Sequence, residues 1–379
     1  MAYTTIDDPS KYFQIALWTG DNADTRNITN DGNSDLQPDW VWIKSRSNDG
    51  NGFDHTVWDT SRGVSNSINT SLSTSKTDPE GLGENVTTTA QLGGVSAMLS
   101  DGFTVKEGSS ADDARYVNEN TRTYVGWQWK ANGGSRTTFT ESGNNPGGGY
   151  QANTTAGFSI VDYTGTGSAG TVSHGLGATP AVIIVKSRTG AADSDGDWNV
   201  FHHKNTSAPA TDFLILNEAT ATTDADNRWN DTAPTSSVFT VGTTTRVNND
   251  AHNYIAYCFT EIQGYSKFGS YTGNGNDDGP FVYTGFKPAW IMVKNTGGSE
   301  NWALHDTKRS PANGNKAELF PNIDSTESVG NVRFDLLSNG FKVRQGSATA
   351  INDNGDSIMY FAFAEHPFVS SKGVPATAR

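Results

Sequence analysis

Hydrophobic residues occur along this chain in short runs, and Gly, Asn, Asp, Thr and Ser separate the runs almost everywhere. Such punctuation leaves little helical periodicity and is typical of short strands joined by turns. The three most apolar runs each follow a proline, at residues 38–44, 180–186 and 288–294. The second and third contain Val-Ile-Ile-Val and Trp-Ile-Met-Val, which predicts strands buried on both faces. The pattern therefore predicts an all-β protein.

The apolar pattern is repeated three times. Each post-proline run ends at a lysine six residues after the proline (Lys44, Lys186 and Lys294), and four further landmarks keep the same order around it. The landmarks are an aromatic residue followed by Thr-Gly (18–20, 163–165, 271–273), a Trp- or His-led strand (55–59, 198–202, 302–306), a Phe-x-Val strand (102–105, 238–241, 340–343) and an aromatic-rich strand (124–129, 254–259, 358–363). Their agreement predicts one unit of domain size used three times.

We expect three tandem homologous β-sandwich units with a jelly-roll-like fold, each with its own dry interior. The expected units are residues 1–134 with an N-terminal arm, 153–264, and 265–379 with a C-terminal tail. Residues 135–152 are rich in glycine and predict a flexible linker. The next junction, residues 261–268, is short and partly apolar, so units two and three should pack more rigidly than units one and two. The arm could be a strand, a short helix or an anchoring segment.

Composition supports folded cores and excludes several partners. Of 379 residues, 34% are hydrophobic and 11% aromatic, which disordered chains lack. The formal charge of −14 disfavours nucleic acids and anionic membranes. A single cysteine, Cys258, excludes an intrachain disulfide and predicts a buried thiol. No run is long and apolar enough to span a bilayer, and no export signal begins the chain, so we expect synthesis in a cytosol without membrane insertion.

Two aromatic pairs are the first candidates for binding. Trp40 and Trp42 share one face of a strand, and so do Trp127 and Trp129. Exposed rings of this kind could form a platform for sugars. Large aromatic side chains are also what a sandwich core requires, and their recurrence in every unit favours the core.

Metal sites have only weak support. Residues 193–197 and 352–356 resemble half of a calcium-binding loop, but both lack the bidentate carboxylate expected near position twelve, so turn chemistry is favoured and calcium stays open. The seven histidines form no His-Glu-x-x-His motif. His202 and His203 would point to opposite faces of a strand, which disfavours zinc. We predict no metal and no cofactor.

Enzymatic motifs are missing from the sequence. It has no nucleophile elbow, no P-loop and no dinucleotide fingerprint. Asp-x-x-Arg occurs at 59–62 and 306–309, and a structural salt bridge explains it as well as a site would, while His202 and Asn205 replace it in the second unit. The chain is therefore predicted not to be an enzyme, with no catalytic residue and with its ligand-binding residues unknown.

Several segments carry a resemblance to a known group of proteins. They are residues 3–13, 30–40, 269–275, 283–290, 361–368 and 376–379. These segments resemble marine bacteriophage (cyanophage- and pelagiphage-type) virion structural or tail-fibre-like proteins with a repeated domain of unknown function. The similarity covers essentially the whole chain. It implies a place in a virion and provides no catalytic motif.

The resemblance implies a phage virion structural protein, most of all a tail-fibre or host-recognition appendage that contacts host surface glycans through loops. A capsid decoration or head-fibre protein is the alternative. A polysaccharide depolymerase fits less well, because a β-helix repeat signature is missing. The expected partners are other virion proteins, copies of the chain in a homotrimer, and host surface polysaccharide, with assembly in the host cytoplasm. The first unit is expected to be the virion anchor.

Overall fold

The chain is built almost entirely of antiparallel strands. The computed structural model describes residues 3–47, 52–63, 70–81, 93–108, 115–189, 196–346 and 348–376. Within these ranges the helices are short: η1 (Pro9–Lys11), α1 (Asp226–Trp229), α2 (Thr245–Asn248) and α3 (Thr349–Asn352). None of the described helices is long and apolar enough to cross a membrane. The prediction of a β-strand protein is confirmed: the described residues form several antiparallel sheets and very few short helices.

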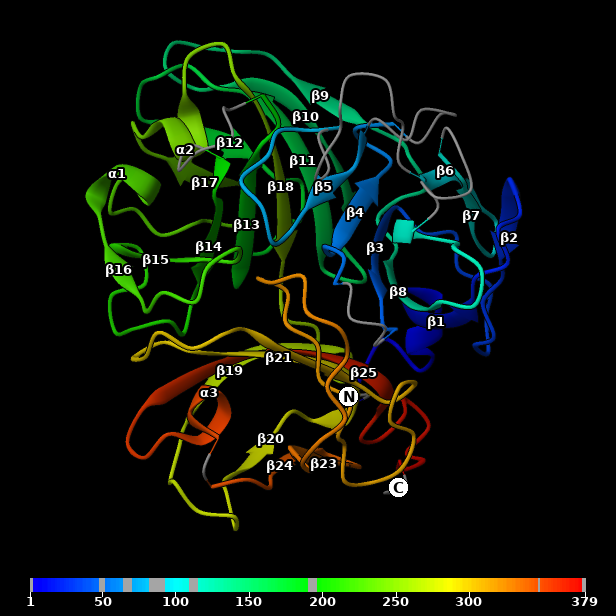
Figure 1. Cartoon of the computed structure of the whole chain (residues 1–379). Coiled ribbons are helices and arrows are strands. Elements are labelled where there is room, and N and C mark those ends of the chain that lie inside the picture. Colours follow the sequence, from blue (N-terminus) through cyan, green and yellow to red (C-terminus); the bar gives the residue numbers. More distant parts are fainter. Residues whose placement is uncertain are drawn as a thin grey trace.

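The strands form three assemblies, each with one large and one small sheet (Figure 1). The first has the order β1 (Phe13–Thr19), β8 (Thr123–Trp129), β3 (Trp40–Ser45), β4 (Thr56–Asp59), β5 (Leu72–Ser73), with β2 (Thr25–Ile28), β7 (Gly102–Lys106), β6 (Gly94–Leu99) beside it. The second has β16 (Thr223–Asp224), β15 (Asp212–Ile215), β14 (Trp198–His202), β13 (Val182–Ser187), β18 (Asn253–Phe259), β11 (Phe158–Thr164), β10 (Gly147–Asn153), β9 (Thr137–Phe139), with β12 (Gly170–Ser173) and β17 (Val238–Val241). The third has β19 (Ser266–Thr272), β25 (Ser357–Pro367), β21 (Phe286–Asn295), β22 (Ala303–Asp306), with β20 (Phe281–Tyr283), β24 (Gly340–Val343), β23 (Phe334–Leu337).

One strand order recurs in the three large sheets. The order β1-β8-β3-β4 is repeated as β11-β18-β13-β14 and as β19-β25-β21-β22. In every copy the post-proline run lies between the aromatic-rich strand and the Trp- or His-led strand. Equivalent residues also pair in register, as in Trp42 with Trp127 and Met292 with Phe361. The landmarks of the sequence therefore mark equivalent places in three sheets.

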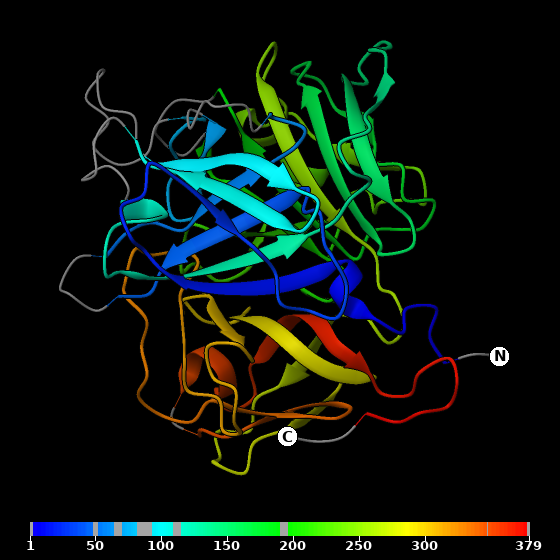
Figure 2. The ribbon, with the colours of Figure 1, turned by 90° about the vertical axis from the view of Figure 1, so that its right-hand side faces the viewer.

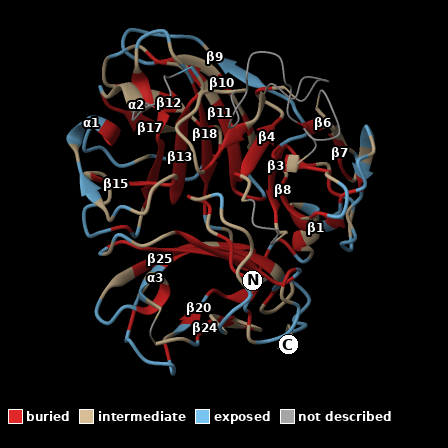
Figure 3. Cartoon of the chain, in the orientation of Figure 1, coloured by how far each residue is buried: buried red, intermediate tan, exposed pale blue. Residues whose placement is uncertain are grey.

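Each large sheet is covered on both faces, and the burial map shows this as three largely buried sheets (Figure 3). On β13, Ile183 and Val185 face the small sheet of their own assembly, while Val182 and Ile184 face the other assemblies. This alternation follows from the pleat, which sends successive side chains to opposite faces. It explains why the post-proline runs have no polar face.

A single central core joins the three assemblies. Trp40 of the first assembly stacks on Tyr257 of the second, with ring centroids 4.4 Å apart. Trp129 meets Trp290 of the third assembly at 5.8 Å in an edge-to-face contact. All four rings are buried in one cluster to which every large sheet contributes. The expectation that each unit keeps only its own interior is thus corrected. Each assembly has a hydrophobic core of its own, and the three assemblies also share a larger hydrophobic core.

The glycine-rich segment at 135–152 differs from the flexible linker that the sequence predicts. Its residues form β9 and β10, which extend the large sheet of the second assembly. Gly148 is required there, because a Cβ atom would lie 2.1 Å from the Asp162 carbonyl oxygen on β11. Arg136 also binds Asp162, with 2.8 Å between Nε and Oδ1. Glycine in this segment permits close strand packing and does not signal a loose connector.

The N-terminal segment runs along the third assembly, next to the C-terminal residues (Figure 2). Thr4 donates a hydrogen bond to the Gln263 carbonyl oxygen at 2.8 Å, and the Ser371 amide donates to the Asp7 carboxylate at 2.6 Å. In the described part of this segment, from residue 3 on, residues 9–11 form the short helix η1. The arm that the sequence leaves open therefore ties the beginning of the first assembly to the third.

The shared core predicts that the molecule unfolds as one body. We expect Trp290→Ala to lower the free energy of unfolding by about 3–5 kcal/mol, because it removes a buried indole and leaves a cavity. Circular dichroism and tryptophan fluorescence during urea denaturation should still report one coincident transition. Leu17→Ala, at a side chain that is 40% exposed, is the control and should change stability by less than about 0.5 kcal/mol. Separate transitions, with only one of them shifted, would contradict the shared core.

Candidate functional site

The tryptophans considered as a sugar platform lie in the central core. Trp40, Trp42, Trp127 and Trp129 are at most 3% exposed. Their rings pack against one another and against the other assemblies. These side chains stabilise the fold and offer no surface to a ligand.

Buried lysines connect the three assemblies in a closed ring. Each post-proline lysine is fully buried and donates to a backbone carbonyl of the next assembly. The Nζ–O distances are 2.7 Å from Lys44 to Asp324, 2.9 Å from Lys186 to Thr77 and 3.1 Å from Lys294 to Ala219. Burial lowers the pKa of Lys44 to about 8, of Lys186 to about 7 and of Lys294 to about 8. The repeated lysine therefore has a structural explanation at the contacts between assemblies.

Indole donors connect the second assembly to the first and the third assembly to the second, as the buried lysines do. Trp198 Nε1 donates to the Ser73 carbonyl at 2.7 Å, and Trp302 Nε1 donates to the Ile215 carbonyl at 3.0 Å. In the first assembly His55 stands at the equivalent position, and burial holds the pKa of its imidazole well below the ordinary value. The second and third assemblies thus each present an indole donor to a backbone carbonyl of the assembly that follows in the cycle.

The two Asp-x-x-Arg motifs belong to buried ion clusters between assemblies. Arg62 Nε lies 2.6 Å from Asp59 Oδ2, and Arg188 of the second assembly lies 2.7 Å from Glu80 of the first. Tyr257 donates to Asp59 at 2.7 Å. The second cluster has the same parts in Asp306, Arg309, Glu327, Arg46 and Trp127. The motifs are therefore interface salt bridges.

At the third contact all four charged positions are neutral. His202, Asn205, Thr222 and Thr296 occupy them, and Thr222 Oγ1 donates to Asn205 Oδ1 at 2.6 Å. The Thr222 backbone amide donates to the Thr296 carbonyl oxygen at 3.0 Å. The Glu80 backbone amide donates to the Arg188 carbonyl oxygen at the same distance, 3.0 Å. Because the four replacements occur together, no charge is left without a partner. The departure at His202 and Asn205 is part of this joint exchange.

The acidic loops show turn chemistry where they are described. Residues 193–195 lie outside the described part of the chain. In the other loop, the buried Asn352 accepts from the Asn274 amide at 2.9 Å and donates to the Asn276 carbonyl at 2.8 Å. The described residues contain no group of three or more His, Cys, Asp or Glu placed to hold a metal ion.

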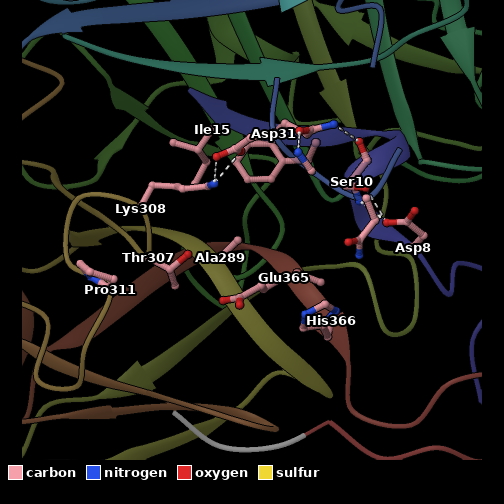
Figure 4. A pocket seen from close by; sticks show the side chains of 15 residues that line it. Asp8, Ser10, Ile15, Asp31, Ala289, Thr307, Lys308, Pro311, Glu365 and His366 are labelled. Carbon is pink, nitrogen blue, oxygen red and sulfur yellow. Dashed lines mark hydrogen bonds and ion pairs between the residues drawn. The ribbon is translucent and has the colours of Figure 1, made fainter. Parts of the chain in front are cut away.

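A polar cleft opens between the first and third assemblies (Figure 4). Its cavity volume is about 340 Å³. The first assembly contributes η1, the start of β1 and the loop at 31–33, while β21, β25 and the loop at 307–311 form the opposite wall. Lys308 Nζ lies 2.6 Å from Asp31 Oδ1 and bridges the two walls.

The cleft combines apolar and polar lining side chains. Phe13 and Ile15 of the first assembly and Ala289 and Ala364 of the third supply the apolar part, and Glu365 and His366 line the third assembly's side. Burial raises the pKa of Asp8, but hydrogen bonds from Ser10 and Ser34 outweigh it and hold that pKa below the ordinary value. The cleft thus places hydrogen-bond donors and acceptors beside apolar side chains, as small-molecule sites do. No sequence motif marks this cleft, because its residues come together only when the two assemblies meet.

The architecture is that of an antiparallel β protein in which three similar sheet assemblies share one core. The chain belongs to a family described as a domain of unknown function (DUF7483), whose model matches residues 8–367. This single domain spans all three assemblies. No curated protein and no solved structure matches the chain.

Substitutions in the ion cluster around Asp59 should have strongly non-additive effects on stability. Glu80→Thr alone is expected to lower the free energy of unfolding by about 3 kcal/mol, because two arginines lose their carboxylate partner. The fivefold variant Asp59→His, Arg62→Asn, Glu80→Thr, Arg188→Thr, Tyr257→Phe reproduces the neutral contact, in which Phe361 packs on His202, and should recover most of that loss. Urea denaturation measures both, with Glu141→Thr at an exposed position as control. Additive losses in the fivefold variant would contradict the joint exchange.

His202 predicts one component of acid sensitivity. Burial lowers the pKa of its imidazole from 6.5 to about 3 in the folded chain. Between these values the unfolded chain binds one more proton, so the free energy of unfolding falls as the pH falls. In His202→Gln the slope against pH between 6 and 4 should be smaller by about 1.4 kcal/mol per pH unit. An unchanged slope in His202→Gln would refute the assignment to His202.

Proposed function

We propose that the chain is a structural protein of a bacteriophage virion and serves as a tail-fibre or host-recognition appendage that contacts host surface glycans. The resemblance of its segments to phage virion proteins supports the location. The polar cleft between the first and third assemblies is the observation that carries the glycan contact, because its size and its mixture of apolar and polar lining side chains fit a sugar.

The finer organisation belongs to the same proposal. The recurring strand order supports three homologous β-sandwich units of jelly-roll-like type, descended from one repeated unit. The appendage acts as a homotrimer together with other virion proteins, and it assembles in the host cytoplasm. The protein is not an enzyme in this proposal, and it requires no cofactor. A shared core suits such a role, because it holds surface loops in fixed relative positions.

The location is tested on purified particles of a phage whose genome encodes this chain. We expect gold-labelled antibodies against it to mark the tail and to block adsorption to host cells. Labelling spread over the capsid would instead support a decoration or head-fibre protein. Absence of the chain from the particles would refute the proposal. Release of reducing sugar from host polysaccharide would identify a depolymerase.

The contribution of the cleft is tested on the purified protein. Lys308→Ala and Asp31→Asn each break the ion pair that bridges its two walls. We expect either change to weaken attachment to host polysaccharide, measured by biolayer interferometry, at least fivefold. Lys316→Ala, at an exposed lysine outside the cleft, is the matched control and should bind as the wild type does. Equal binding by all variants would remove the cleft from the proposed function.

A further inference from the structure

The edge strand β20 exposes two aromatic side chains on one face. Phe281 and Tyr283 are each 47% exposed, while Val282 between them is buried in the core of the third assembly. The strand has a neighbour on one side only, β24, within its sheet (Figure 1). Exposed large apolar side chains that lie side by side require an explanation, whereas single ones do not.

The equivalent strands of the other two assemblies show that the fold does not require these rings. Val282 pairs with Phe341 on β24, as Ile28 pairs with Phe103 and Val172 with Phe239. The flanking outward positions are Asn27 and Thr29 in the first assembly, Thr171 and Ser173 in the second, and Phe281 and Tyr283 in the third. The same scaffold thus carries small polar residues in two copies and aromatic rings in the third alone.

The surroundings of Tyr283 supply polar groups and a hollow. A cavity of about 360 Å³ adjoins its ring, and Glu261, Gln263 and Lys267 are among its lining residues. Tyr3 fixes the position of the ring, because its hydroxyl lies 3.1 Å from that of Tyr283. The Lys267 ammonium lies 5.6 Å from the Tyr283 ring centroid. Carboxylate, amide and ammonium groups therefore converge beside an exposed ring.

We infer that β20 and the cavity beside Tyr283 form a glycan-binding subsite that takes pyranose rings. Aromatic faces pack against the C–H face of a pyranose, while Glu261, Gln263 and Lys267 offer acceptors and donors to its hydroxyl groups. Side chains two residues apart on a strand are separated by about 7 Å, so Phe281 can meet a neighbouring sugar of the same chain. The inference deepens the proposed glycan recognition and rests on it, but it places this subsite outside the polar cleft.

The matched variant uses the residues of the first assembly. Phe281→Asn with Tyr283→Thr should keep the fold, because the first assembly forms the same sheet with Asn and Thr. Saturation-transfer NMR and calorimetry with methyl glycosides and disaccharides of glucose, galactose, mannose and N-acetylglucosamine provide defined probes. We expect binding of at least one probe by the wild type, and at least a tenfold loss in the double variant. Asn27→Phe with Thr29→Tyr adds rings without the cavity and should not create a second site.

The outcomes separate this inference from the proposed function. Equal sugar binding by the double variant, with loss in Lys308→Ala, would overturn the subsite and leave glycan recognition to the polar cleft. Self-association that the double variant abolishes, without sugar binding, would identify a contact between copies and overturn the subsite. Binding of no probe would also overturn it, while labelling of phage particles tests the virion location independently.

Discussion

Both faces of each large sheet are apolar, so each sheet must be covered twice. The small sheet of the same assembly covers one face, and the other large sheets cover the second. An isolated assembly would expose Trp40, Tyr257 or Trp290 to water, at a cost of about 2–3 kcal/mol for each large side chain. The central core therefore makes the three assemblies interdependent, and the rest of the structure follows from that constraint.

Apolar burial alone does not fix how the sheets are aligned, because the hydrophobic effect is not directional. The buried lysines supply direction, since each ammonium must find carbonyl oxygens at a fixed distance after leaving water. Lys186, for example, meets Gly196 of its own assembly and Thr77 of the first. A sheet that slid along its neighbour would leave the charge unpaired. The same constraint explains why all four charged residues are replaced at the third contact. If one charged residue remained there alone, its charge would be buried without a partner.

Local features of the fold could be predicted from the sequence, but its assembly could not. The strands and the double burial of Val182–Val185 follow from patterns within a few residues. The shared core does not follow from such patterns. A Trp-rich strand face indicates that it will be buried, but it does not indicate which other element will cover it. The same limit hides the polar cleft, whose residues come from segments far apart, and it also explains the misassigned linker. Glycine permits both a loose chain and close packing, and only the neighbouring strand decides between them.

The three copies act as an internal comparison that separates structural residues from candidate binding residues. Asn118, Asn248 and Asn352 are all fully buried at equivalent places and bind backbone groups of nearby turns, so every copy needs this amide. The outward face of β20 behaves in the opposite way, because its residues differ from those of both other copies at positions where the backbone pairing is the same. A feature that the fold needs should recur with the fold. The aromatic pair does not recur. Tyr283 has one contact that is peculiar to the third assembly, the hydroxyl of Tyr3 in the N-terminal arm, and the proposed subsite accounts for the parts of both rings that stay exposed.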